Sequence, residues 1–187
     1  MSSNTRLRKL DDPEGPFTAI ILATAGLLRL NMADRITSRL EAPTLYYAVG
    51  QGALAIETRS QDVRVSAMVQ KLNHWETSWR VLAEREMLRV LEGGCSVPVG
   101  VWTTLTPVVQ DQEAHLKIDA VIASLAGDRS ITASIEGVIK SNQDAEALGK
   151  EIAFMLIERG GKEILEELGR KVESAAFQQR HEDAVKR

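Results

Sequence analysis

Cysteine, histidine and long apolar runs are scarce in this chain of 187 residues, and each scarcity excludes a class of protein. A single cysteine, Cys95, cannot build an internal disulfide framework and suits a reducing compartment. One cysteine and three scattered histidines show no metal-ligand spacing, so we expect no metal site. No apolar run approaches membrane-spanning length, and the N-terminus lacks the apolar stretch of a signal peptide. We therefore expect a cytoplasmic protein without a membrane partner.

The charge balance is close to neutral, with a formal net charge of -3 at pH 7 and a pI near 5.7. Proteins that contact nucleic-acid phosphates are usually basic, so we expect no nucleic-acid partner. The hydrophobic fraction of 44% is sufficient for one large core or two small ones.

The first part of the chain, residues 1–73, has the pattern of an α/β unit, but with too few strands for a sheet covered on both faces. Continuous or alternating apolar runs predict its strands at residues 17–23, 46–49 and 54–58. Helical spacing and turn residues predict its helices at residues 5–10, 24–29, 34–40 and 62–72.

The second part, residues 74–187, has the pattern of a self-contained α+β domain. Trp75 and Trp79 lie on the apolar stripe of a long helix predicted at residues 76–91, which indicates a core role for both rings. Short links predict an antiparallel meander of three strands at residues 97–105, 115–124 and 130–139. A further helix is predicted from a cap at Ser141 or Asn142 to a break at residues 160–161.

The cysteine lies between the long helix and the first of these strands, in the stretch Glu92-Gly93-Gly94-Cys95-Ser96-Val97-Pro98-Val99-Gly100. Its two leading glycines can end a helix in the left-handed conformation and let a ligand approach the backbone. Most lone cysteines are small buried hydrophobes. A sulfur on a glycine hinge between two rigid elements is instead held in place and accessible, so Cys95 is a candidate reactive thiol.

Three sequence blocks resemble the porphobilinogen deaminase (hydroxymethylbilane synthase) family in order and spacing. They are the cysteine loop at residues 92–100, AVGQGALAIE at residues 48–57, and NTRLRKL at residues 4–10, which is followed by AIILATAGL at residues 19–27. The resemblance extends from about residue 4 to about residue 170.

The resemblance implies a transferase that condenses four porphobilinogen molecules head to tail, releases ammonia and gives hydroxymethylbilane in tetrapyrrole (haem) biosynthesis. It implies a dipyrromethane cofactor attached through a thioether to Cys95. By motif position, the cofactor-binding residues would be Arg6, Arg29, Ala23 and Gln51. Arginine suits this role, because its planar guanidinium can bind a pyrrole carboxylate with two parallel hydrogen bonds.

Other cationic side chains have no motif that assigns them to the cofactor. We interpret Arg8, Arg35 and Arg59 as solvated surface charges.

The resemblance also implies an architecture. Residues 1–49 would be part of a periplasmic-binding-protein-like α/β domain, and residues 50–73 would return to a first domain. Residues 74–187 would form a C-terminal domain with a three-stranded antiparallel sheet covered by helices. The family's first domain, with the catalytic aspartate, would precede residue 4 and act as this chain's partner. We therefore expect the C-terminal portion of a monomeric enzyme, which does not turn over alone.

Two other classes of function remain open at this point. A non-catalytic module could keep the arginines and the cysteine and bind tetrapyrroles or other carboxylates. A cysteine hydrolase could pair Cys95 with His74, His115 or His181, although none of these histidines lies in a recognisable dyad motif.

Overall fold

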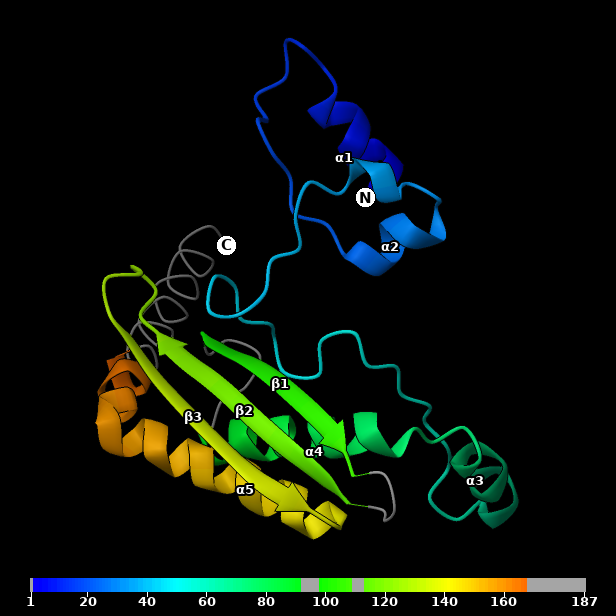
Figure 1. Ribbon diagram of the computed structural model, residues 1–187, viewed down its shortest axis with the longest axis vertical. Coiled ribbons are helices and arrows are strands. Elements are labelled where there is room, and N and C mark those ends of the chain that lie inside the picture. The colour runs from blue at the N-terminus through cyan, green and yellow to red at the C-terminus, as the bar shows by residue number, and fades with distance from the viewer. Residues whose placement is uncertain (1, 92–97, 109–112, 168–187) are drawn as a thin grey trace, which may run out of the picture. The chain divides into compact units, whose positions relative to one another are not determined.

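The computed structural model describes residues 2–91, 98–108 and 113–167, which divide into two compact units, Met1–Glu41 and Ala42–Arg187 (Figure 1). The smaller unit contains the helices α1 (Ser3–Leu10) and α2 (Thr24–Arg29) and the 3-10 turn η1 (Ala33–Arg35). Both helices were predicted from the sequence, and each buries one leucine, Leu7 or Leu27. The helix predicted at residues 34–40 is wrong beyond the short turn, because Ile36 already has an extended backbone. Its β-branched side chain favours that conformation.

The strands predicted at residues 17–23 and 54–58 are also wrong. Both segments lack ladder partners, and Ile21 and Leu54 are 70% and 92% exposed. A strand is stable only where a neighbour satisfies its backbone N–H and C=O groups, and no described segment does so here. The strand predicted at residues 46–49 is reduced to one antiparallel bridge, between Tyr47 and Val101.

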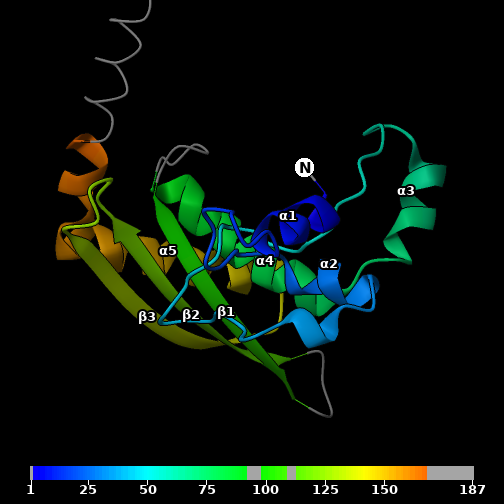
Figure 2. The same cartoon turned by 90° about the horizontal axis from the view of Figure 1, so that it is seen from above.

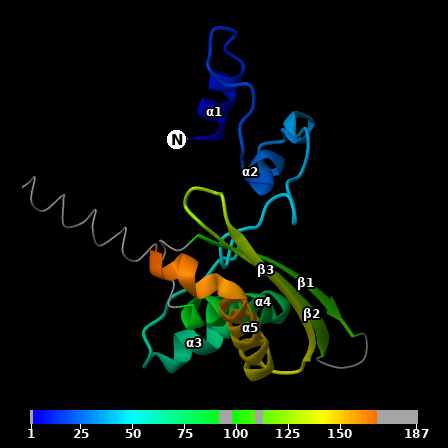
Figure 3. The ribbon, with the colours of Figure 1, turned by 90° about the vertical axis from the view of Figure 1, so that its left-hand side faces the viewer.

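The larger unit contains a three-stranded antiparallel sheet in the order β1-β2-β3, as predicted. Its strands are β1 (Val99–Pro107), β2 (Ala114–Ala123) and β3 (Ser130–Ile139). Its helices include α3 (Val63–Gln70), α4 (Trp75–Val90), α5 (Asn142–Leu156) and the short π-helix η2 (Ile157–Gly161), and residues 162–167 are also helical. In Figures 2 and 3, α4 and α5 lie together on one face of the sheet.

Alternation along β2 creates the core between sheet and helices. Every second residue of this strand is buried: Ala114, Leu116, Ile118, Ala120 and Ile122. The apolar stripes of the two helices supply the other side, with Trp79, Ala83 and Met87 from α4 and Leu148, Ile152 and Leu156 from α5. Each large aliphatic side chain buried in this way contributes about 1.5–3 kcal/mol.

Two backbone devices set the position of α5. Ser141 is the N-cap, with its hydroxyl accepting a hydrogen bond from the Asp144 N–H at 3.2 Å, and the predicted break occurs at Gly160, whose φ is 101°.

In the middle of α5, Gly149 lies against α4 so closely that a Cβ there would be 2.1 Å from the Ala83 carbonyl oxygen. Glycine therefore sets the distance between the two helices.

Candidate functional site

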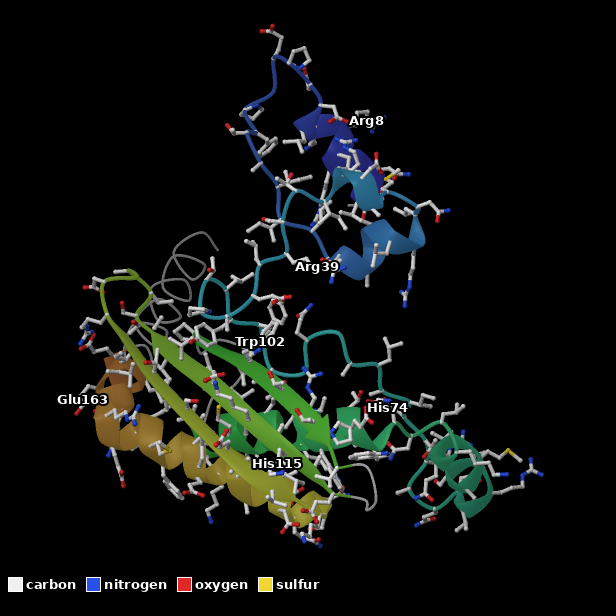
Figure 4. All side chains as sticks on the ribbon, in the orientation of Figure 1. Arg8, Arg39, His74, Trp102, His115 and Glu163 are labelled. Atoms are coloured by element: carbon white, nitrogen blue, oxygen red, sulfur yellow. The ribbon has the colours of Figure 1, made fainter. Side chains whose placement is uncertain are left out.

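The segment formed by residues 46–52 contains AVGQG, the first half of the block at residues 48–57, and lies along the free edge of β1. Tyr47 and Val101 exchange two backbone hydrogen bonds, of 3.0 Å and 2.8 Å, and the Tyr47 ring lies 5.3 Å from that of Trp102, which is labelled in Figure 4. A Cβ at Gly100 would be 2.5 Å from the Cβ of Tyr46. The last glycine of the cysteine motif is therefore needed for this segment to reach the strand.

The turn that carries Gln51 depends on two glycines in left-handed conformation. Gly50 and Gly52 have φ values of 71° and 84°, and a Cβ at either would meet nothing within 4 Å. These positions need glycine for its backbone freedom rather than for space. Backbone hydrogen bonds from Gln51 to Ala48 and from Ala53 to Gly50 close two successive turns, and the Gln51 side chain is exposed.

A buried carboxyl group ties this turn to the core of the larger unit. Glu84 of α4 is only 6% exposed, and its Oε2 accepts a 2.7 Å hydrogen bond from the Gly50 N–H. Its Oε1 accepts a 2.6 Å hydrogen bond from the Thr103 hydroxyl of β1, which in turn accepts one from Arg80 Nε at 2.9 Å. Sequence reasoning missed this cluster. The available signals were an acidic residue beside the apolar stripe of α4 and a threonine at an inward position of β1.

The two elements that hold this segment are the ones that flank the cysteine loop. Helix α4 ends at Val90, and β1 begins at Val99. Cys95 itself lies outside the described residues, as does most of its loop. The first half of the block at residues 48–57 is thus attached to α4 and β1, the two elements that precede and follow the cysteine loop in the sequence.

The other predicted cofactor residues lie in the smaller unit and are exposed. Arg6 is on α1, Ala23 is the N-cap of α2, and Arg29 is the last residue of α2. The start of α1 lies near α2, since a Cβ at Gly26 would be 3.8 Å from the Ser3 hydroxyl. Gln51 belongs to the larger unit.

The arginines differ in their partners. Arg35 forms an ion pair with Asp11, which agrees with its interpretation as a surface charge. No ion pair joins Arg6 or Arg29 to a carboxylate of the described residues, so both are open to a carboxylate from outside. The same holds for Arg8 (labelled in Figure 4) and Arg59, so exposure does not distinguish these arginines from the two that the family resemblance assigns to the cofactor.

The histidines have other roles or lie elsewhere. His74 caps α4, with its Nδ1 accepting a hydrogen bond from the Thr77 N–H at 3.3 Å, and His115 is an exposed residue of β2 (both labelled in Figure 4). His181 lies outside the described residues. In the part of the chain that the structure describes, no three His, Cys, Asp or Glu side chains gather as metal ligands, and no helix is long and apolar enough to cross a membrane.

Comparison with known proteins gives two matching family models. "Porphobilinogen deaminase, dipyromethane cofactor binding domain" matches residues 2–67, and "Porphobilinogen deaminase, C-terminal domain" matches residues 78–158. Curated porphobilinogen deaminases of Synechococcus elongatus, Eremothecium gossypii and Schizosaccharomyces pombe are 46%, 45% and 41% identical to this chain. The chain belongs to the porphobilinogen deaminase family.

The alignments with these porphobilinogen deaminases cover most of this chain but only about half of each relative. The three alignments cover 88%, 87% and 91% of this chain, but only 48%, 49% and 50% of those relatives. The chain thus spans about half the length of the curated relatives it matches. Arg6, Ala23, Arg29 and Gln51 lie within the first matched range, and Cys95 lies within the second.

Proposed function

We propose that this chain is the cofactor-carrying part of a hydroxymethylbilane synthase. Together with the part of the enzyme that it does not span, it would condense four porphobilinogen molecules into hydroxymethylbilane and release ammonia. The observation that carries the proposal is the attachment of the Gln51 turn to both elements that flank the cysteine loop. The family resemblance assigns the motifs of Gln51 and Cys95 to one cofactor, and the described contacts attach the first motif to the two elements between which the second lies in the sequence.

The residues present fit a covalently held dipyrromethane. Cys95 offers the chain's only thiol, and a thiolate is a soft nucleophile suited to an electron-poor methylene carbon. Attachment would form a sulfur–carbon bond as the carbon–nitrogen bond of porphobilinogen breaks and its amine leaves as ammonia. Once bound, the dipyrromethane primes the growing chain of pyrroles. Arg6 and Arg29 would hold its carboxylates, and Ala23 and Gln51 are the other residues that the family motifs assign to it.

The proposal also covers the catalytic aspartate, the oligomeric state and the cellular compartment. We place the catalytic aspartate in the portion of the enzyme that this chain does not span, and we propose a monomeric, cytoplasmic enzyme. Residues 1–49 would complete a periplasmic-binding-protein-like domain there. Residues 17–23 form an apolar segment that has no ladder partner in the described chain and exposes Ile21, which supports a sheet partner in the part of the enzyme that this chain does not span.

A fusion protein tests this function. This chain would be joined to the half of the Synechococcus elongatus enzyme that it does not span, and porphobilinogen consumption, ammonia release and intact mass would be measured. We expect turnover, a mass increase of two linked pyrroles, and the colour reaction of pyrroles with an aldehyde reagent. A folded fusion that binds tetrapyrrole carboxylates but releases no ammonia would contradict the proposal and favour a binding module.

Substitution of Arg29 tests the carboxylate-binding role. In the fusion, Arg29→Ala should weaken binding of pyrrole intermediates by about 2–5 kcal/mol, because it leaves a partly buried carboxylate unpaired. Arg29→Lys keeps the charge but loses the bidentate geometry, so its defect should be smaller. Melting temperature should barely change for either variant, since the exposed side chain makes no ion pair with the described residues.

The matched control is Arg8→Ala on the same unit, which we expect to leave activity unchanged. An unfolded Arg29→Ala protein beside a fully active Arg29→Lys protein would show a structural residue instead.

A further inference from the structure

Glu84 is a buried acidic side chain with both oxygens committed to other parts of the larger unit. One oxygen accepts from the Gly50 N–H and the other from the Thr103 hydroxyl, at 2.7 Å and 2.6 Å. Burying a carboxyl group is costly unless hydrogen bonds replace its lost water. Here the Gly50 N–H and the Thr103 hydroxyl replace that water.

The direction of the second hydrogen bond follows from Arg80. A guanidinium nitrogen can only donate, so the Thr103 oxygen is the acceptor in its 2.9 Å contact with Arg80 Nε. The hydroxyl hydrogen is then free to point at Glu84. Arg80 and Thr103 together orient one oxygen of Glu84, and this leaves the other aimed at the Gly50 N–H.

The Gly50 hydrogen bond is the last anchor of the segment before the chain becomes exposed. Upstream, Tyr47 is fixed to Val101; downstream, Leu54 is 92% exposed. Between them lie Gly50 and Gly52, whose backbones have the most freedom to rearrange. Without the carboxyl group, only the local turn hydrogen bonds and the packing of Val49 against the core would keep Gln51 in place.

We propose that Glu84 is a positioning residue: it fixes the Gly50–Gln51–Gly52 turn, and with it the Gln51 side chain, relative to the elements that flank Cys95. This inference rests on the proposed function, because Gln51 is assigned there to the cofactor pocket. Helix α4 then has two tasks. Its middle holds the Gln51 turn, and its end leads to the cysteine loop.

Amide hydrogen exchange on the full 187-residue chain tests the anchor directly. In Glu84→Met, which has no strong acceptor but fills a similar volume, Gly50 and Gln51 should exchange about tenfold faster or more, as expected for a lost hydrogen bond to a buried partner. Exchange at Tyr47, Val101 and Met87 should stay as in the unmodified chain. Glu84→Gln keeps one acceptor oxygen and should restore protection of Gly50. The matched control is Glu86→Gln on the same helix, which pairs with Arg89, leaves both contacts of Glu84 in place and should not accelerate the exchange of Gly50.

Two exchange results would overturn the anchor. Unchanged exchange at Gly50 in Glu84→Met would mean that the contact holds nothing. Equal acceleration throughout α4, β1 and the turn would mean that Glu84 only stabilises the fold.

The fusion protein tests the consequence for binding. Glu84→Met should raise the KM for porphobilinogen about tenfold with kcat little changed, and Glu84→Gln should restore it. A loosened turn with unchanged KM would refute the positioning role. A fusion with no activity before any substitution would refute the proposed function, and the exchange experiment would still decide whether Glu84 anchors the turn.

Discussion

Cys95→Ala should abolish both pyrrole attachment and hydroxymethylbilane formation in the fusion protein. The thioether is the only covalent link that the proposed mechanism allows, and the chain has no second cysteine to replace it. Loss of a covalent nucleophile typically lowers turnover by several orders of magnitude, on the order of a million-fold where the nucleophile is essential. Intact mass and the ammonia assay would follow the two losses together.

Alkylation gives an independent check on the same sulfur. Because this chain has one cysteine, its part of the fusion should take up one iodoacetamide group, on Cys95, when prepared without porphobilinogen and none when it carries the adduct, as peptide mass mapping would show. Cys95→Ser provides a near-isosteric control for folding, and it should melt like the unmodified protein while lacking the adduct. A fully active enzyme with a free, alkylatable Cys95 would rule out the thioether.

Gly149→Ala should be the most destabilising single-methyl change in the larger unit. The new Cβ would be 2.1 Å from the Ala83 oxygen and 2.8 Å from its carbonyl carbon. Both are backbone atoms of α4, so relief requires the two helices to separate and the core between them to loosen. Overpacking of this kind costs about 3 kcal/mol or more, and a loss of that size lowers the melting temperature by about 6–12 °C in a chain of this length.

Gly137→Ala on β3 is the matched control for this change. Its Cβ would also be tight, at 3.1 Å, but against the Cδ1 methyl of Leu148, which can rotate away. We expect a change of less than about 1 kcal/mol there. Thermal and urea unfolding of both variants would decide the matter, and equal losses would contradict the assignment of Gly149 as the residue that sets the helix spacing.

The elements that could be predicted from the sequence are those whose pattern and neighbours are close together in the chain. Alternation in β2 and the 3.6-residue stripe of α4 each report a buried face, and short links between β1, β2 and β3 determine their pairing. Residues 17–23 have the same apolar signal but remain unpaired in the described chain, because a parallel strand depends on segments far away in the sequence.

The residues of the candidate site also differ in whether the sequence could predict them. Cys95 stands out by its glycine-rich surroundings, and the resemblance selects Arg6, Arg29, Ala23 and Gln51 by motif. Glu84 could not be found in this way, because its partners Gly50 and Thr103 are 34 and 19 residues away. A glutamate on a helix usually faces water, and only the fold shows that this one does not.

The bridge between Tyr47 and Val101 has a second consequence, for solubility. Because β1 is an edge strand, the backbone N–H and C=O groups on its side away from β2 could pair with a strand of another chain. Residues 46–52 block this edge at Val101, whose N–H and C=O groups both form hydrogen bonds with Tyr47. Any change that frees this segment would therefore expose an unpaired strand edge as well as displace Gln51, so self-association should accompany the displacement of Gln51.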